Sequence, residues 1–404
     1  MTRITARHWF GLIVIIAFAV LGYALLRPRD TFTPSVPARP IAVKPLSSTS
    51  GPDEWVMEGH DPARTRSTGT VLTLPLTRKR ELQVPADETA GSPLTIGRDM
   101  VFVETENTLT ALDLDTGKQR WAVYENGSYI SPAVAGSTVY MRIELANKGT
   151  LFALDTATGD ERWRFTPERI STSATNYWGG HLTSPVVSHG KVFIGAGQEV
   201  YALDASTGRQ LWRFNGADLI AGSAAVAGGR VYISDASFLY ALREDNGELV
   251  WKTPVSFAVY FSPVVANGTV YVSSGKSILA VSATDGSKRW EASYEGEQLA
   301  PTGVEGTRLF VSSQSKLRAL DTATGRELWL YKEPNYLSSP AIAQGKLLVT
   351  AGSTGETRLV AIDAASGKAV WEEPVDALAT EAPVIAGGTV YVRTEDGHVL
   401  KYGR

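Results

Sequence analysis

The sequence predicts an all-β fold, an eight-bladed β-propeller closed by N- and C-terminal strands in one blade and preceded by a single N-terminal transmembrane helix. Tryptophan recurs seven times, at intervals of 39 to 49 residues, between Trp121 and Trp371. Eight small-residue pairs, most of them ending in proline, recur at a similar spacing. Near the N-terminus, the eighteen residues 9–26 carry no charge.

Each recurring tryptophan closes the same phrase, Ala-Leu-Asp-x-x-Thr-Gly-x-x-x-Trp or a close variant. Seven copies with one internal spacing and a period near 40 residues are typical of a repeat protein. We expect the following indoles to dock between successive blades, where aromatic rings bury a large area. They are Trp121, Trp163, Trp212, Trp251, Trp290, Trp329 and Trp371.

The middle of the phrase predicts a tight turn between two strands. Asp accepts hydrogen bonds from turn amides, and Gly, present in all seven copies, adopts the positive φ that the turn needs. Arg243 and Ser282 replace Asp in the fourth and fifth copies. We expect those two turns to be the least rigid.

A second recurring feature marks the start of each unit, about 11–12 residues after most of the tryptophans. It is a small-residue pair followed by a Gly turn and an alternating strand. The pairs begin at Ser92, Ser131, Ser184, Ser223, Ser262, Ala300, Ser339 and Ala382. Eight starts against seven tryptophan phrases leave one blade without its closing strand.

The register of the sequence locates that missing strand. Leu82 precedes Pro93 by 11 residues, as Trp121 precedes Pro132, so Leu82 occupies a tryptophan position. The last unit ends near Tyr402 without a fourth strand. We therefore expect residues 80–84 to pair with the C-terminal strand, because a closed ring leaves no terminal sheet unpacked. The alternatives, a β-helix or an open solenoid, do not explain these complementary ends.

The N-terminal region predicts a membrane attachment in three parts: residues 1–26 as tail and signal anchor, 27–54 as a Pro/Ser-rich linker and 55–404 as the propeller. Eighteen apolar residues after Arg3 and Arg7 are long enough to span a bilayer as a helix. A cleaved signal peptide is the alternative, with cleavage after Ala19 or Ala24. We expect a single-pass protein of the cell membrane with its propeller on the extracytoplasmic side.

Composition excludes several classes of site. The chain has no cysteine, which excludes disulfides, thiolate metal sites and a lipidated cysteine. Residues 55–404 carry 33 Lys and Arg against 39 Asp and Glu, so we expect no nucleic-acid partner. No catalytic fingerprint or metal-ligand histidine spacing occurs. We expect no catalytic, cofactor-binding or metal-binding residues, and a monomeric propeller.

The tryptophan phrase resembles the repeat of the pyrroloquinoline-quinone (PQQ-like) propeller family, in which it is the tryptophan-docking motif. The resemblance covers about residues 55–404, and Trp55-Val-Met-Glu-Gly-His-Asp-Pro-Ala-Arg-Thr65 resembles the segment that opens the first blade. It implies the eight-bladed fold but no particular function.

The family has two branches that bear on function. Quinoprotein dehydrogenases hold PQQ and calcium in a central funnel, usually beside paired cysteines, which this chain lacks. Non-enzymatic scaffolds similar to BamB hold protein partners instead. We predict a BamB-like scaffold for protein or peptide partners, with no enzyme activity and no cofactor. The alternative is a quinoprotein-like redox or small-ligand-sensing domain.

The partner-binding face is predicted where loops join the outermost strand of one blade to the innermost strand of the next. Aromatic side chains on rigidly held loops give a large contact area. An insertion after Trp163 also adds a Gly-rich aromatic stretch. A purely structural role for these side chains is the alternative. The candidates are Tyr129, Tyr177, Trp178, His181, Tyr260 and Tyr336.

Acidic residues gather on the same loops, and the sequence places few bases beside them. They predict either a surface that attracts a cationic ligand or an ordinary solvated rim. They include Asp87, Glu88, Glu125, Asp218, Glu295, Glu297, Asp376 and Glu381.

Overall fold

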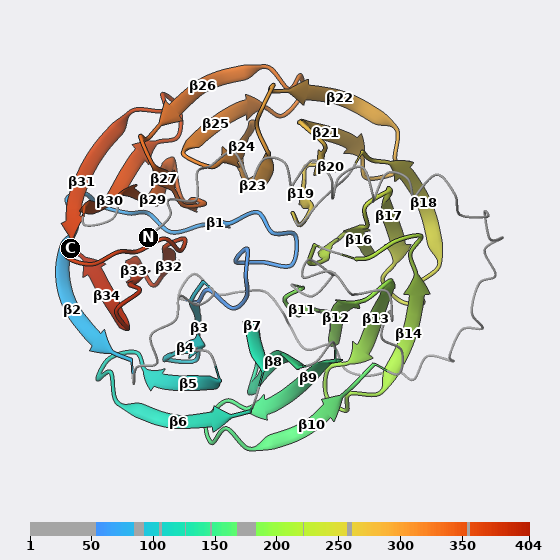
Figure 1. Ribbon diagram of the computed structural model, residues 1–404, viewed down its shortest axis with the longest axis horizontal. Coiled ribbons are helices and arrows are strands. Elements are labelled where there is room, and N and C mark those ends of the chain that lie inside the picture. The colour runs from blue at the N-terminus through green and yellow to red at the C-terminus, as the bar shows by residue number, and fades with distance from the viewer. Residues whose placement is uncertain are drawn as a thin grey trace, which may run out of the picture. The chain divides into compact units, whose positions relative to one another are not determined.

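A computed structural model describes residues 54–84, 93–104, 107–125, 127–145, 148–167, 183–220, 222–256, 261–353 and 356–404. The described residues form β-strands and no helix, arranged as eight sheets around a ring (Figure 1). The eight-bladed propeller is thereby confirmed. The predicted transmembrane helix at 9–26 lies outside the described residues. Within the described part of the chain, no helix is long and apolar enough to cross a membrane.

Blades 1 to 4 follow in chain order, each with its strands running from the ring centre outward. Blade 1 has β3 (Thr95–Gly97), β4 (Met100–Glu104), β5 (Thr108–Asp113) and β6 (Gln119–Tyr124). Blade 2 has β7 (Ser128–Ala135), β8 (Thr138–Leu145), β9 (Lys148–Asp155) and β10 (Glu161–Phe165). Blade 3 has β11 (Val186–Ser188), β12 (Lys191–Ala196), β13 (Glu199–Asp204) and β14 (Gln210–Asn215). Blade 4 has β15 (Ala225–Ala227), β16 (Arg230–Ser234), β17 (Phe238–Arg243) and β18 (Leu249–Pro254).

Blades 5 to 8 complete the ring. Blade 5 has β19 (Val264–Ala266), β20 (Thr269–Ser274), β21 (Ser277–Ser282) and β22 (Lys288–Ser293). Blade 6 has β23 (Ala300–Glu305), β24 (Arg308–Ser313), β25 (Lys316–Asp321) and β26 (Glu327–Lys332). Blade 7 has β28 (Ala341–Ala343), β29 (Lys346–Ser353), β30 (Glu356–Asp363) and β31 (Ala369–Val375), joined by β1 (Ser67–Thr68) and β27 (Tyr336–Leu337). Blade 8 has β32 (Val384–Ala386), β33 (Thr389–Arg393), β34 (His398–Gly403) and β2 (Thr77–Gln83).

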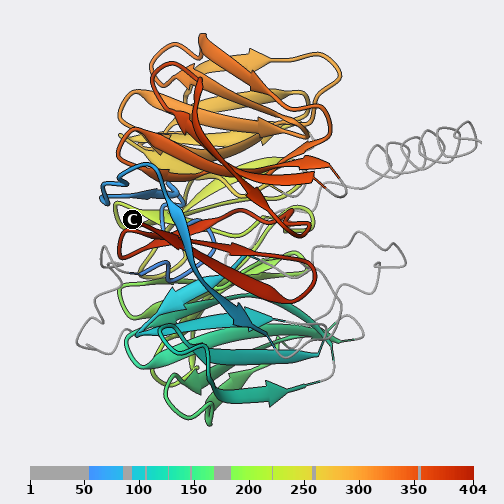
Figure 2. The same ribbon diagram turned by 90° about the vertical axis from the view of Figure 1, so that its left-hand side faces the viewer.

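Blade 8 contains both ends of the propeller. β2 pairs antiparallel with β34, with Arg78 opposite Tyr402 and Leu82 opposite Val399. The two strands lie side by side as the blue and red ribbons at the edge of the ring (Figures 1 and 2). The N-terminal strand therefore supplies the fourth strand of the last blade, and the sheet is closed by backbone hydrogen bonds.

The indoles lie in the seams between blades. Gly325, at the turn of blade 6, has φ +72°, and a Cβ there would come within 2.5 Å of the Trp290 ring of blade 5. Trp290 Nε1 also donates to the carbonyl of Thr322, 2.8 Å away in blade 6. Corresponding bonds cross five other seams, from Trp121, Trp163, Trp212, Trp251 and Trp329.

The closing blade changes this arrangement on both of its sides. Leu82 takes the tryptophan position beside Gly117, whose Cβ would meet the Leu82 side chain at 3.0 Å. Trp371 has no such glycine turn among the described residues, because the outermost strand of blade 8 is β2 and no turn joins it to β34. It packs instead on the apolar cluster that contains Leu72 and Leu76, just before β2.

The turns that follow the Ala-Leu motif share one backbone hydrogen bond. Gly117 N donates to Asp113 O at 2.8 Å, and Gly247 N donates to Arg243 O at 3.0 Å. Asp113 adds a side-chain bond from the Thr116 amide at 2.7 Å, which Arg243 does not provide. Since both turns keep the same backbone bond, the lower rigidity of the Arg243 and Ser282 turns stays a prediction.

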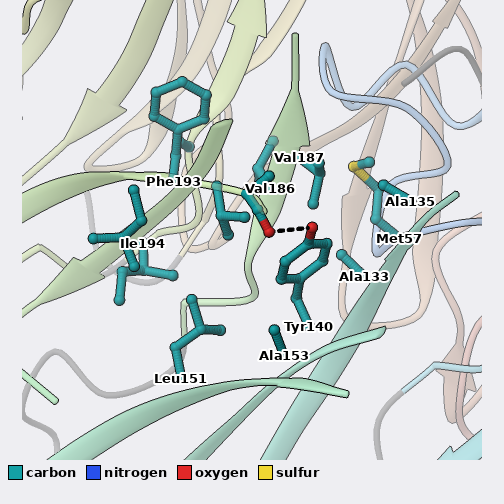
Figure 3. Close-up of a cluster of buried hydrophobic side chains, with 14 of the residues drawn as sticks. Met57, Ala133, Ala135, Tyr140, Leu151, Ala153, Val186, Val187, Phe193 and Ile194 are labelled. Carbon is teal, nitrogen blue, oxygen red and sulfur yellow. Dashed lines mark hydrogen bonds between the residues drawn. The ribbon is translucent and has the colours of Figure 1, made fainter. Parts of the chain in front are cut away.

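Tyrosines of the second strands reinforce the seams. The Tyr140 hydroxyl donates to the carbonyl of Ala205 at 2.9 Å (Figure 3). The Trp163 indole donates to the same carbonyl at 3.2 Å. Tyr232 and Tyr271 make the corresponding contacts to Ala283 and Thr322. Each of these blades is therefore held to its neighbour by two aromatic donors.

Candidate functional site

The ring has two faces, which differ in the kind of connection they carry. The turn face carries the turns that contain the recurring glycines. The loop face carries the connections from the outermost strand of one blade to the innermost strand of the next. Because consecutive strands of a blade are antiparallel, these connections all emerge on the face opposite the turns. The predicted partner-binding residues belong to the loop face.

Residues 54–70, called here the inner segment, run around the ring centre from blade to blade (Figure 1). Their carbonyls accept hydrogen bonds from amides of the innermost strands, such as Val134 N to Val56 O at 2.7 Å. The backbone partners in chain order are Ile96, Val134, Val226, Val265, Val304 and Ile342. The chain thus occupies part of its own ring centre and joins six blades that are far apart in sequence.

Apolar side chains and one close approach fix the inner segment in place. Met57, 1% exposed, packs beside Ala133, Ala135 and Val187 of blades 2 and 3 (Figure 3). In blade 6, a Cβ on Gly303 would stand 2.7 Å from the Thr65 carbonyl. Only glycine leaves room for the segment to pass β23 at this distance.

The backbone of the inner segment places its polar side chains through uncommon conformations. His60, Arg64 and Arg66 all have positive φ, at 73°, 62° and 53°. Bulky residues rarely adopt this region, so the surrounding hydrogen bonds must hold them there. Such positions cluster at functional sites, which makes the segment a candidate.

Glu58 and Arg64 form a buried ion pair at the ring centre. Arg64 Nη2 lies 2.8 Å from Glu58 Oε1, and the Ser184 hydroxyl donates to Glu58 Oε2 at 2.6 Å. Burial alone would raise the pKa of Glu58, but Arg64, Ser184 and Arg66 outweigh it and lower the pKa. Both carboxylate oxygens of Glu58 are therefore engaged.

Arg66 is buried two residues further along, with 9% of its surface exposed. Burial lowers its pKa to about 10, opposed by attraction to Glu58 and Glu381, so it stays charged at neutral pH. Burial also raises the pKa of Glu381, which lies three residues before the innermost strand of blade 8. Among the described residues, no hydrogen-bond or ion-pair partner lies against the Arg66 guanidinium.

Several polar atoms of the inner segment are buried without a hydrogen-bond partner among the described residues. They are Trp55 Nε1, both ring nitrogens of His60 and Arg64 Nη1. Buried polar groups are normally satisfied, and each exception requires an explanation. Four such atoms on three residues lie within ten positions of this segment, which is a higher density than in the blades.

The predicted tyrosines that the structure describes are bonded within the fold. Tyr129 accepts from the Glu125 amide at 2.7 Å and donates to the Asn107 carbonyl at 2.9 Å, and burial raises its pKa to about 12. Tyr336 donates to Ala379 O at 3.1 Å, linking blade 7 to the loop before blade 8. Both hydroxyls thus hold loop-face connections in place, whereas partner binding by these residues stays a prediction.

The other predicted site residues lie outside the described residues. They are Tyr177, Trp178, His181 and Tyr260.

The expectation of few bases near the acidic residues of the loop face is wrong for Glu295, Glu297 and Asp376, whereas Asp87 and Glu88 lie outside the described residues. Glu297 lies 2.6 Å from Arg318 and also binds Lys316, and Arg318 in turn lies over the ring of Tyr294. Burial would raise the pKa of Glu297, yet these bases lower it to about 2. Glu295 and Asp376 are paired as well, with Lys276 and Arg78. The bases come from neighbouring strands, which the linear sequence keeps apart.

The described residues at the ring centre do not fit a PQQ and calcium pair. Calcium takes six to eight oxygen ligands, and carboxylates contribute most of them. Both oxygens of Glu58 are already bonded, and Glu381 has a raised pKa that disfavours the charged ligand form. Among the described residues, no group of three His, Asp or Glu side chains is placed to hold a metal ion.

The blade repeats match the model of a known protein family. A family model described as outer membrane protein assembly factor BamB matches residues 64–200, 196–336 and 313–403. The chain belongs to this BamB family. No curated protein sequence matches the chain.

Solved structures similar to this BamB family member share the fold at low sequence identity. BamB from Moraxella catarrhalis has a TM-score of 0.64 and 17% identity, covering 82% of this chain and 100% of its own. Quinohemoprotein alcohol dehydrogenase from Comamonas testosteroni has a TM-score of 0.69 and 14% identity, covering 87% and 81%. A europium-containing methanol dehydrogenase has a TM-score of 0.67 and 12% identity, covering 88% and 98%. At these identities the likeness shows the fold alone.

The sequence analysis missed the functional candidates Glu58, Arg64 and Arg66. One signal was available, because Glu58, Asp61, Arg64 and Arg66 place four charged residues within nine positions, which is unusual for a buried stretch of chain. Nothing in the local sequence shows that this stretch runs through the ring centre, because its partners belong to six different blades.

Proposed function

We propose that this BamB family member is a non-enzymatic scaffold that binds protein or peptide partners on the loop face of its propeller. It is tethered to the membrane by residues 9–26 and acts on the extracytoplasmic side. The family match over most of the chain carries the proposal, because the family is described as that of the outer membrane protein assembly factor BamB. The engaged oxygens of Glu58 support it, because this carboxylate of the ring centre is bonded within the chain and is not free to bind the calcium that the redox alternative needs.

A rigid ring is well suited to this role. The seams hold the blades with indole and tyrosine donors, and the inner segment joins six blades through their innermost strands. A scaffold held in this way presents its loops without a large cost in conformational entropy on binding. The fold thus favours recognition by the loop face, whichever loops make the contact.

The alternative is a quinoprotein-like redox or ligand-sensing domain, and the two dehydrogenase structures share the propeller fold. Incubating the purified full chain with PQQ and calcium separates the two functions. The scaffold proposal expects neither saturable binding nor dye reduction. Saturable binding of PQQ together with dye reduction contradicts it.

Cross-linking in intact cells tests the scaffold role directly. The full chain should yield the same protein partners in repeated experiments, identified by mass spectrometry. As a matched control, the same chain with Trp290→Ala, which loosens a blade seam, should lose those partners as its fold weakens. Failure of the intact chain to capture any specific protein contradicts the proposal.

A further inference from the structure

The strongest unexplained feature of the molecule is the guanidinium of Arg66 at the ring centre. It is buried, charged and held by a backbone conformation that bulky residues avoid. Glu58 and Glu381 attract the guanidinium, but its nitrogens are not among the side-chain atoms that are fully buried without a partner, so a ligand can still reach them. The described part of the chain supplies no such partner at hydrogen-bond distance.

Neither of the acidic groups near Arg66 bonds to it directly. Glu58 uses both oxygens on Arg64 and Ser184. Glu381 attracts Arg66 and Arg393 without a direct contact to Arg66, and its backbone carbonyl accepts from Thr350 at 3.0 Å. Arg66 therefore has no direct ion pair in this cluster, although both carboxylates attract it.

The position of the cluster identifies the side from which a ligand would approach. Ser184 and Glu381 both stand just before innermost strands, at the ends that lead to the loop face. The cluster is not sealed, because the Glu58 side chain keeps 25% of its exposure and Glu381 is partly exposed. Arg66 therefore lies within reach of the face on which the scaffold is proposed to bind its partner.

We propose that Arg66 binds a carboxylate group of a peptide partner that enters the ring centre from the loop face. The planar guanidinium suits a carboxylate because it donates two parallel hydrogen bonds. The group comes either from an Asp or Glu side chain or from the free C-terminus of the partner. This inference rests on the proposed scaffold function and adds the chemical class of the recognised segment.

A peptide selection on the full chain provides the probe. A phage library of random 12-residue peptides is panned against the full chain, and the best peptide is synthesised for fluorescence-polarisation binding. It is compared with versions in which each Asp or Glu becomes Asn or Gln, and with a C-terminal amide. Loss of affinity on an Asn or Gln substitution indicates that a side-chain carboxylate binds, and loss of affinity on amidation indicates that the C-terminal carboxylate binds.

The chain variants then test the contact itself. Neutralising the critical carboxylate should weaken binding at least tenfold, and Arg66→Gln should weaken the original peptide by a similar factor. The two changes together should cost little more than either alone, since they remove the same contact. Arg80→Gln, on the exposed face of β2, should leave binding unchanged.

A further variant keeps the test valid if Arg66→Gln melts at a lower temperature. Glu381→Gln removes an acid that attracts Arg66, so it should tighten binding of the acidic peptide several-fold. Weaker or unchanged binding by this variant overturns the inference.

The other outcomes separate the inference from the function on which it rests. Selected peptides that bind without any carboxylate, or additive losses in the paired changes, overturn the role of Arg66 and leave the scaffold function standing. Selection of no peptide at all contradicts the scaffold function as well.

Discussion

Replacing Trp290 by alanine tests how the blades are held together. The indole is 7% exposed, lies against Gly325 of the next blade and packs at 5.7 Å, between ring centroids, from Tyr271. It also donates a 2.8 Å hydrogen bond to the Thr322 carbonyl. Burying a tryptophan ring removes roughly 150–250 Å² from water, worth about 4–6 kcal/mol at roughly 25 cal/mol per Å². Partial relaxation of the cavity brings the expected loss in unfolding free energy to about 3–5 kcal/mol.

Trp371 provides the matched control, since it occupies the same position in the repeat. It is only partly buried, has no glycine turn to dock on, and makes no indole hydrogen bond to the described residues. Trp371→Ala should therefore lose only about 2 kcal/mol.

Urea unfolding of each full-length variant, monitored by far-UV circular dichroism, measures its free energy of unfolding. The comparison is made at the same m-value, the slope of this free energy against urea concentration. Equal losses for the two variants, or a loss below about 1 kcal/mol for Trp290→Ala, refute the account of the seams.

Three further perturbations test other parts of the fold. Gly303→Ala should push the inner segment away from β23, because its Cβ would stand 2.7 Å from the Thr65 carbonyl; faster proteolytic cleavage near residue 65 is the expected readout, and unchanged cleavage contradicts it. Leu82→Ala should lose about 2–4 kcal/mol, since this 2% exposed side chain fills the closing seam; a melting temperature equal to that of the parent chain argues against closure by β2. Glu297 has its pKa lowered from 4.5 to about 2 by Arg318 and Lys316 despite burial, so it stabilises the fold above pH 4.5 and loses this effect as pH falls toward 2. Glu297→Gln should flatten the stability curve in that window alone, and an unchanged curve contradicts the ion pair.

The ring could be predicted from the sequence because its determinants are local and repeated. One phrase fixes a strand, a turn and an indole, and in six of the seven copies the indole bonds to the next blade. Even the closing strand follows, since Leu82 stands in register with Trp121. Repetition makes each copy a check on the others.

The ring centre could not be predicted, because the inner segment has no periodicity of its own. Its hydrogen-bond partners, from Ile96 to Ile342, are spread over nearly 250 residues of chain. The ion pairs of Glu297 were missed for the same reason, since Arg318 belongs to a neighbouring blade. Contacts of this kind depend on the assembled ring and leave no local pattern.

Site-specific photo-cross-linking in intact cells tests the proposed function most directly. A photoreactive residue is introduced at Gln298 or Asn335, both exposed on the loop face, and separately at Ala157 or Ala323, both exposed on the turn face. The scaffold account predicts discrete protein adducts from the loop-face positions and none from the turn-face positions. Adducts of equal yield from both faces, or from the turn face alone, contradict it.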